Sequence, residues 1–281
     1  TITSELIPVK RIQSPDWYWP GMLDRAAFHI KNWISARRLV RAARAWHPDV
    51  VYTRDASIAP FADVVEAHRL MRPHRRMIAI SQGLKDVLVL NGANSDNVLV
   101  AHDGVNLDEF DVAESQEECR IKLCLPAGRL IIGYVGQLRT LGMEKGIGTL
   151  IQAFQKVSNA LLLIVGGAPD DISYYRSYAM SIGIASHDIM FTGRVPHSAI
   201  PQYLKACDVL TMPFPALDHY ARIMSPLKLF EYMAAKRPII ATDLPSIREV
   251  LNEHSALLVN PGDARVLAEG IILLLSDHER S

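Results

Sequence analysis

The sequence predicts an α/β protein built on parallel sheets, and two observations support this fold class. From Ile131 onward, short apolar runs alternate with amphipathic stretches, which is the pattern of a parallel sheet with helices on both faces. Turn residues follow several of the apolar runs, as at Gly166-Gly167, Gly193 and Pro213. Ligands of open α/β sheets bind where the strands end, so these turns are the first candidates for a site.

The second half of the chain supplies the elements of one Rossmann-like domain. Its predicted strands are LIIGYV, LLLIVGG, IMFTG, VLTMPF, PIIATD and ALLVN. The helices predicted between them are GTLIQAFQKV, SYYRSYAMSIG, IPQYLKACD and PLKLFEYMAA. Strand followed by helix, repeated in this way, indicates a doubly covered parallel sheet.

The first half contains units of the same type but is less complete. A helix is predicted over Leu23 to Trp46, a strand in HPDVVYTR, a strand and a helix in MIAISQGLKDVLVLNG, and a strand in NVLVAHDGV. No initial strand with a glycine loop opens the chain, and EAHRLMRPHRRMIAIS leaves hardly any room for a crossover. We therefore expect segments of the native protein to be absent before Thr1 and near Leu70.

A polar, acidic stretch, NLDEFDVAESQEECR, has no strand pattern and suits a hinge between domains. This predicts a partial N-terminal domain over residues 1–106 and a C-terminal domain over residues 107–281.

Composition excludes several classes of partner and site. The 30 basic and 30 acidic side chains balance, so no overall charge favours nucleic acid, and a charged ligand needs a local site. Three cysteines without paired spacing predict neither a disulfide framework nor a zinc site. No apolar run approaches the roughly 20 residues of a membrane span, and the first residues lack the layout of a signal peptide. These observations favour a cytoplasmic protein.

The first candidate site is GYVGQLRTLGMEKGIGTLIQAF, residues 133 to 154. It combines a strand, the turn at Gly136, the basic residues Arg139 and Lys145, and a helix that opens on glycine. Backbone amides and the positive end of a helix dipole favour an anion, and the two basic side chains can add charge-assisted bonds. A diphosphate suits this arrangement. Taken alone, the stretch is equally compatible with a solvated loop.

The second candidate site is MSPLKLFEYMAAKRPIIATD, residues 224 to 243. Pro226 suits the first turn of a helix, and the amides around it can face a phosphate. Glu231 lies one to two turns further on, where its carboxylate can accept both hydroxyls of a ribose. A surface or capping role is the alternative for this glutamate.

Taken in order, these segments resemble the retaining family 4 glycosyltransferases of the GT-B fold. Four motifs carry the resemblance: VGQLRTLGMEKGIGTLIQAF, LLLIVGG, FTGRVPHSAIPQYLKACDVLTMP and LFEYMAAKRPIIATDLPSIREVL. The resemblance spans about Ser81 to Asp277 and implies two Rossmann-like domains with a cleft between them. It also implies metal-independent transfer with retention from a nucleotide-sugar donor, and the absence of a D-x-D motif agrees with this. No cofactor or metal ion is expected.

By motif position, the resemblance assigns the family's donor contacts to individual residues of this sequence. The lysine that grips the diphosphate corresponds to Lys145, the helix-start amides to those near Pro226 and Leu227, and the ribose-binding glutamate to Glu231. The family's arginine falls on Gln137, and we propose Arg139 as its substitute. The family's first glutamate, which contacts the sugar hydroxyls, falls on Ile223.

Further residues enter through the same resemblance. The segment Ser225 to Ala234, SPLKLFEYMA, is typical of bacterial polysaccharide and lipopolysaccharide transferases, in which Lys228 would add charge near the donor. A solvated lysine is the alternative. The turn with Arg194 and Val195 resembles the site that reads the base, although a plain loop arginine is equally compatible. His68 lies near the end of VVEAHRL, residues 64 to 70, where the family often places a histidine beside the transferred sugar.

The resulting prediction is a glycosyltransferase that moves a sugar to a glycan or lipid-linked acceptor. The basic stretch from Arg25 to Arg44, with nearby aromatic residues, suits a peripheral contact with anionic lipid at the inner face of a membrane, or simply a solvated helix face. Two other functions remain open: a nucleotide-sugar 2-epimerase of the same fold, and a catalytically silent module that binds a nucleotide-sugar or a protein.

Overall fold

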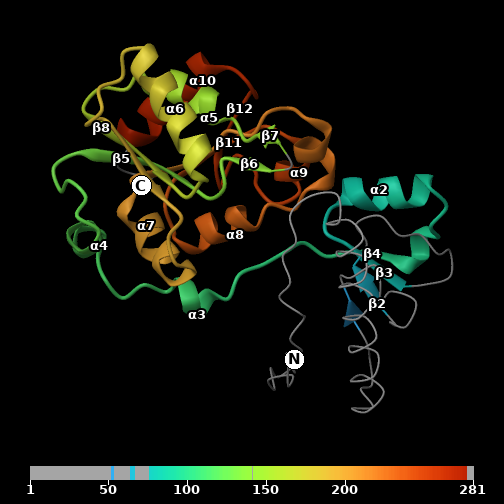
Figure 1. Ribbon diagram of the computed structural model, residues 1–281. Coiled ribbons are helices and arrows are strands. Elements are labelled where there is room, and N and C mark those ends of the chain that lie inside the picture. Colours follow the sequence, from blue (N-terminus) through green and yellow to red (C-terminus); the bar gives the residue numbers. More distant parts are fainter. Residues whose placement is uncertain (1–51, 54–63, 67–75, 141, 277–281) are drawn as a thin grey trace, which may run out of the picture. The chain divides into compact units, whose positions relative to one another are not determined.

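The computed structural model describes residues 52–53, 64–66, 76–140 and 142–276, and Figure 1 shows them as coloured ribbon. The chain divides into two compact units. The first takes the residues up to Ala79 together with Leu84–Ala101, and the second takes Ile80–Gly83 together with the residues from His102 onward. The chain thus enters the second unit at His102, a few residues before the boundary predicted after Asn106.

The first unit contains a parallel sheet of four strands in the order β1-β2-β3-β4. The strands are β1 (Tyr52–Thr53), β2 (Val64–Glu66), β3 (Arg76–Ala79) and β4 (Val98–Val100). Helix α2 (Gln82–Leu90) and the 3₁₀ turn η2 (Ser95–Asn97) connect β3 to β4. Strand β4 lies within the predicted NVLVA segment, and β3 begins one residue before the predicted MIAIS segment and overlaps it. The helix predicted over Leu23 to Trp46 lies outside the described residues.

The second unit is built on a parallel sheet of six strands in the order β12-β11-β10-β5-β8-β9. Each strand comes from one of the apolar runs of the sequence, and the bounds are β5 (Leu130–Val135), β8 (Ala160–Val165), β9 (Ile189–Gly193), β10 (Val209–Met212), β11 (Ile239–Thr242) and β12 (Leu257–Val259). All six strands predicted for this half are therefore present.

Helices cover both faces of this sheet (Figure 1). One face carries α5 (Ile147–Phe154), α6 (Pro169–Ser181) and α10 (Ala264–Ser276). The other carries α4 (Gln116–Lys122), α7 (Ile200–Ala206), α8 (Leu227–Ala234) and α9 (Pro245–Arg248). The remaining helical segments are α3 (Leu107–Phe110), the 3₁₀ turn η3 (His197–Ala199) and the π-helical segment η4 (His219–Ile223).

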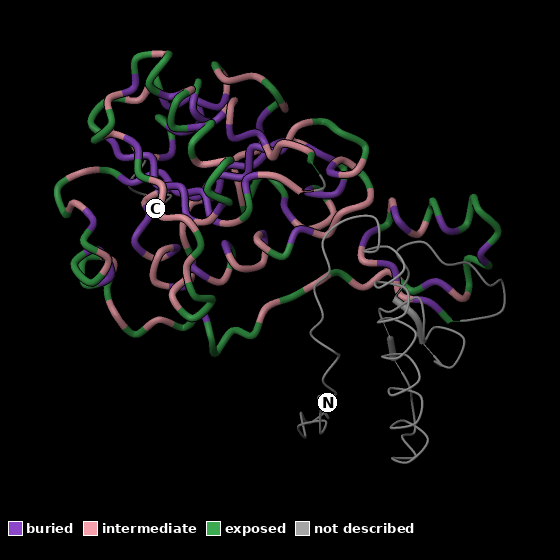
Figure 2. Tube along the Cα trace, viewed as in Figure 1, coloured by how far each residue is buried: buried purple, intermediate pink, exposed green. Residues whose placement is uncertain are grey.

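Alternate residues of the central strands supply the two halves of the core. In β5, Ile131 and Val135 pack on the side of α7 and α8, whereas Ile132 and Tyr134 pack on the side of α5 and α10. Successive side chains of a strand point to opposite faces, so a strand that is buried on both faces must be apolar throughout. Figure 2 shows the buried residues concentrated along these strands.

A partly buried ionic network holds the amino-terminal ends of β5 and β10 together. Asp208 accepts hydrogen bonds from Arg120 Nη2 (2.6 Å), Gln116 Nε2 (2.9 Å) and the Ile131 amide (2.6 Å). Arg237 adds an ion pair to the same carboxylate at 3.8 Å. The network lies at the end of the sheet away from the loops that follow β5 and β10, and its role is therefore structural.

Two small elements were not predicted from the sequence. Strands β6 (Arg139–Thr140) and β7 (Met143–Glu144) form an antiparallel hairpin inside the loop between β5 and α5. The π-helical segment η4 lies between β10 and α8. Both elements follow the carboxyl ends of central strands, where the candidate residues cluster.

Candidate functional site

The candidate site begins where the strand order of the second unit reverses direction. From β5 the chain moves outward through β8 to β9, then returns to the other side of β5 with β10 and continues outward through β11 to β12. Ligands of open α/β sheets bind at such a switch point, beyond the carboxyl ends of the strands. Here the switch point lies between β5 and β10, and the next α-helices to begin after these strands are α5 and α8.

The loops that follow β5 and β10 contact each other through a glycine. Gly146 adopts a left-handed conformation (φ 81°), and a Cβ atom at this position would lie 1.6 Å from the Pro213 carbonyl oxygen. Only glycine permits this contact of two backbones. The contact fixes the position of Lys145, the preceding residue, close to the end of β10.

A carboxylate from the chain itself already caps the start of α5. The Gly148 amide donates a hydrogen bond of 2.9 Å to Glu144 Oε1, and Gly146 is the N-cap residue. A carboxylate satisfies helix-start amides and balances the positive end of the helix dipole. The predicted phosphate contact of this helix start is therefore partly replaced by Glu144.

The start of α8, unlike that of α5, is not capped by a carboxylate of the described residues. Pro226 is its N-cap residue, and among the described residues no side chain caps the helix. The Ser225 hydroxyl instead accepts a hydrogen bond of 3.2 Å from the Asp103 amide. Of the two helix starts at the switch point, that of α8 offers its amides to an anion without competition from a side chain of the described residues.

Lys228 lies in the first turn of α8 and extends across the end of β5. Its Nζ donates a 2.7 Å hydrogen bond to the Tyr134 hydroxyl and lies 4.3 Å from the centre of that ring. A Cβ atom on Gly136 would lie 2.2 Å from the same Nζ. The lysine stem therefore occupies the space that the missing Gly136 side chain leaves open.

The charges of Lys145 and Glu231 act on Lys228, and the three residues form an electrostatic cluster. Burial lowers the pKa of Lys145. The pKa of Lys228 falls well below its usual value through burial and the charge of Lys145, with Glu231 opposing. Burial raises the pKa of Glu231, against the charges of His197 and Lys228. An arriving phosphate would favour the charged form of both lysines, because it supplies an ion-pair partner that neither lysine has among the described residues.

Arg139 lies in β6, and its side chain contacts residues of α6. Its Nε lies 3.1 Å from Asp171 Oδ1 in the first turn of α6. Its guanidinium lies 5.4 Å from the ring centre of Tyr174 and 6.0 Å from that of Tyr175. These contacts attach the β6–β7 hairpin to α6, and the role of Arg139 as a diphosphate ligand stays a prediction.

The remaining predicted residues occupy varied positions. Arg194 is exposed directly after β9, and Val195 packs partly against the core. Leu227 is exposed at the start of α8. Gln137 is exposed, and its carbonyl accepts a hydrogen bond of 2.8 Å from the Tyr134 hydroxyl. His68 lies outside the described residues.

Three residues at the site were missed in the sequence. Tyr134 belongs to an apolar strand and was assigned only to the core, yet its hydroxyl holds Lys228. Glu144 lies two residues before the N-cap, a position from which a carboxylate can reach back to the helix start. His219 opens η4, and burial together with the charge of Lys145 lowers its pKa, which favours the neutral imidazole. Only Glu144 carried a sequence signal, an acidic residue just before a glycine-opened helix.

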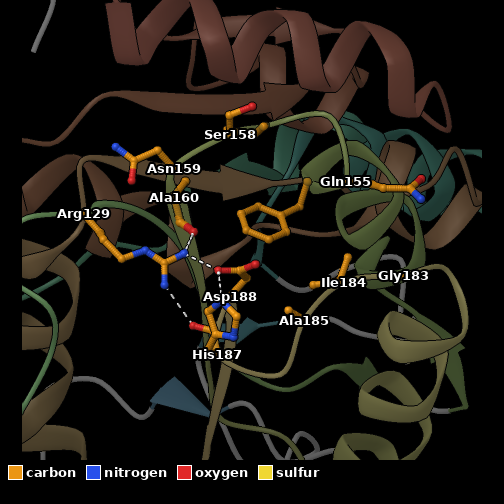
Figure 3. A pocket seen from close by; sticks show the side chains of 12 residues that line it. Arg129, Gln155, Ser158, Asn159, Ala160, Gly183, Ile184, Ala185, His187 and Asp188 are labelled. Atoms are coloured by element: carbon orange, nitrogen blue, oxygen red, sulfur yellow. Dashed lines mark hydrogen bonds and ion pairs between the residues drawn. The ribbon is translucent and has the colours of Figure 1, made fainter.

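A pocket at the opposite end of the sheet shows a different chemistry (Figure 3). Arg129 dominates it, and its guanidinium is bound to Asp188 Oδ1 at 2.6 Å, to the His187 carbonyl oxygen at 3.0 Å and to the Ala160 carbonyl oxygen. These residues lie at the amino-terminal ends of β5, β8 and β9. Because protein acceptors already satisfy the arginine, this pocket is a weaker anion site than the switch point.

The described residues contain neither a cluster of metal ligands nor a helix suited to span a membrane. No group of three or more His, Cys, Asp and Glu side chains is placed to hold a metal ion in this part of the chain. No helix within the same residues has both the length and the apolar character needed to cross a membrane.

Solved structures similar to this chain identify the fold. A glycosyltransferase from Rickettsia africae is 20% identical, with a TM-score of 0.69 over 88% of this chain and 72% of that protein. HepE from Anabaena, solved in complex with UDP-glucose, is 19% identical, with a TM-score of 0.69 over 87% of this chain and 73% of that protein. These similarities confirm the predicted α/β class of GT-B type.

Sequence relatives point in the same direction. The putative teichuronic acid biosynthesis glycosyltransferase TuaC of Bacillus subtilis is 28% identical over 69% of this chain and 45% of its own length. The chain spans about half the length of this protein and of an uncharacterized glycosyltransferase from Methanocaldococcus jannaschii, with 45% and 51% of their lengths covered. The family model described as glycosyl transferases group 1 matches residues 129–277, more than half of the chain. The chain therefore belongs to the glycosyl transferases group 1 family.

Proposed function

We propose that the protein is a glycosyltransferase that binds the diphosphate of a nucleotide-sugar at the switch point of the second unit. One observation supports this proposal most strongly. The start of α8, which no side chain of the described residues caps, lies together with two lysines of lowered pKa, Lys145 and Lys228. Anion-binding amides and cations at one place suit a diphosphate. Glu231, one turn into α8, supplies the acceptor for the ribose hydroxyls.

The proposed reaction transfers the sugar to a hydroxyl of a glycan or lipid-linked acceptor. The bond between the anomeric carbon and the diphosphate oxygen breaks, a bond from the acceptor oxygen to that carbon forms, and the hydroxyl proton leaves with the diphosphate. Cations and helix-start amides offset the charge that develops on the leaving group, which lowers the barrier. Family resemblance supports retention and independence of metal, and we include both in the proposal.

A panel of nucleotide-sugars tests this function. Incubation with the full-length protein should release the sugar slowly as the donor hydrolyses, and NMR should find the anomer of the donor in the initial product. EDTA should leave the rate unchanged. Appearance of a free 2-epimer would instead identify an epimerase, and no turnover of any donor would favour a silent binding module.

The donor contacts have their own test. Lys145→Ala and Glu231→Ala should each weaken the binding of the nucleoside diphosphate released in the panel, measured by calorimetry. The matched control is Lys156→Ala, which removes an exposed lysine just beyond α5. If both site variants bind as tightly as the control, the donor site lies elsewhere.

We also propose a cytoplasmic protein that touches an anionic membrane surface through the basic stretch from Arg25 to Arg44, in order to reach a lipid-linked acceptor. These residues lie outside the described part of the chain. Sedimentation with vesicles tests the contact: the full-length protein should pellet with vesicles that contain anionic lipid and stay in solution with neutral ones. Equal recovery in both supernatants would refute the membrane contact without affecting the donor site.

A further inference from the structure

Only a short connection separates the π-helical segment η4 from α8. Segment η4 ends at Ile223, and α8 begins at Leu227 with Pro226 as its N-cap residue. In a continuous α-helix each carbonyl accepts a hydrogen bond from the amide four residues later, so the Ile223 carbonyl would accept from the Leu227 amide. That bond would consume an amide at the start of α8. For this amide to remain available, the last carbonyls of η4 need other donors.

A serine hydroxyl from a distant part of the sequence binds the last two carbonyls of η4. Ser81 Oγ lies 3.0 Å from each of the Arg222 and Ile223 carbonyl oxygens, and its proton can be shared between them. Ser81 is 1% exposed, so bulk water cannot take the place of its hydroxyl. It precedes α2 and belongs to the segment Ile80–Gly83, which is part of the second unit. The end of η4 is therefore satisfied without the amides of the residues that follow it.

The Arg222 carbonyl needs a donor from outside its own helix for a second reason. The residue four positions later is Pro226, which has no N–H group to offer. Ser81 supplies the missing donor, and Gly83 in the first turn of α2 allows the backbone around it to come close. A Cβ atom on Gly83 would lie 2.2 Å from the Arg222 carbonyl oxygen. Serine and glycine at this spacing thus suit the carbonyl that the proline leaves without a helical partner.

Two further hydrogen bonds fix the connection on either side of these contacts. Before them, Ser246 Oγ of α9 donates to the Tyr220 carbonyl oxygen. After them, the Asp103 amide donates to Ser225 Oγ at 3.2 Å. The approach to α8 is thus held partly by residues that lie 122 to 142 positions earlier in the chain.

Resting on the proposed function, we propose that Ser81 is a positioning residue of the donor site. It acts through the backbone of η4 and does not contact the donor itself. By occupying the Arg222 and Ile223 carbonyls, it leaves the Leu227 amide at the start of α8 free to bind a phosphate oxygen. Without the hydroxyl, the Ile223 carbonyl competes with the ligand for that amide, since a buried carbonyl is costly to leave unpaired.

Calorimetry with UDP, GDP and ADP on the full-length protein tests this role. For the diphosphate that binds best, Ser81→Ala should weaken affinity about fivefold or more, the effect of losing one hydrogen bond from the Leu227 amide. The matched control is Thr211→Val, which also removes a fully buried hydroxyl that donates to a carbonyl, that of Gly133 at 2.9 Å. The control should bind the diphosphate as tightly as the wild type.

Thermal melting separates positioning from a purely structural role. Ser81→Ala and Thr211→Val should both melt below the wild type, because each leaves a buried carbonyl without its donor. Adding Pro226→Ala to Ser81→Ala supplies an N–H group for the Arg222 carbonyl. The melting temperature should then rise toward that of the wild type while the affinity stays low, because the Ile223 carbonyl still competes. Recovery of both quantities would show that the serine is structural only.

The outcomes distinguish the two proposals. Failure of the wild type to bind any of the three diphosphates would overturn the proposed function itself. If Lys145→Ala weakens binding but Ser81→Ala binds as tightly as Thr211→Val, the donor site stands and the positioning role of Ser81 is refuted. If Ser81→Ala does not fold, Ser81→Cys takes its place, because a thiol is a weaker donor and should lower the affinity in the same direction.

Discussion

Replacement of Glu231 by alanine tests how the donor nucleotide lies along α8. The glutamate is four residues beyond Leu227, the first residue of the helix, so it lies about 6 Å further along the axis at about 1.5 Å per residue. A nucleotide whose diphosphate contacts the helix start can therefore reach this carboxylate with its ribose. The proposed contact is a pair of hydrogen bonds from the 2′- and 3′-hydroxyls.

The size of the effect follows from the charge and the partial burial of this carboxylate. A hydrogen bond to a charged group contributes about 1.5–3 kcal/mol, and partial exposure favours the lower value. Two such bonds amount to about 3 kcal/mol, or roughly a hundredfold in the dissociation constant. The wild type should bind the 2′-deoxy nucleotide about tenfold more weakly than the ribonucleotide, and Glu231→Ala should bind both equally.

Calorimetry with the ribo- and 2′-deoxynucleoside diphosphates measures this directly. Met233→Ala, an exposed position on the same helix, is the matched control and should keep the preference for ribose. A Glu231→Ala protein that still prefers the ribonucleotide by about tenfold would refute the proposed contact, even if its overall affinity were lower.

The same contact predicts a pH dependence. Burial raises the pKa of Glu231, against the charges of His197 and Lys228. Hydroxyl donors favour the ionised carboxylate, so the pKa in the complex lies below that of the free protein, and binding releases protons between the two. The ribose preference should be constant above the raised pKa and decrease as the pH falls through it. The deoxynucleotide corrects for titration of the phosphate, and superimposable profiles for the two ligands would contradict the prediction.

Two further predictions concern the framework of the site. Asp208→Ala leaves the buried Arg120 without its carboxylate and should cost about 3–5 kcal/mol of unfolding free energy, measured by urea denaturation; a loss below about 1 kcal/mol would show that the network contributes little. Gly146→Ala introduces left-handed backbone strain of about 1–3 kcal/mol and, in addition, a collision with the Pro213 carbonyl. Gly262→Ala introduces the strain alone, because Gly262 has a similar φ and a Cβ atom there would have no neighbour within 4 Å. Gly146→Ala should therefore be the more destabilising by urea denaturation and should also weaken diphosphate binding; equal losses from the two variants would contradict the close contact.

Local pattern was sufficient to predict the sheet of the second unit. Its strands are apolar throughout because both faces are covered, and each is followed by a turn residue, so the runs from LIIGYV to ALLVN are recognisable without any knowledge of tertiary contacts. The same holds for the positions of α5 and α8, whose glycine and proline mark their starts.

The hairpin and the π-helical segment could not be predicted in this way. Strands of two residues, such as β6 and β7, are too short to show alternation. Contacts between residues far apart in sequence create the site's electrostatics: Lys228 meets Tyr134 across 94 positions, and Arg139 meets Asp171 on another element. A basic residue in a glycine-rich loop therefore indicates an anion site from sequence, but the structure can show that a carboxylate such as Asp171 already binds it.

A crystal structure of the full-length protein with the nucleoside diphosphate of its preferred donor tests the central claim most directly. The account predicts the diphosphate at the start of α8, with Lys145 Nζ and Lys228 Nζ within hydrogen-bond distance of phosphate oxygens and the ribose hydroxyls on Glu231. A diphosphate bound elsewhere, for example beside Arg129 at the opposite end of the sheet, would contradict it.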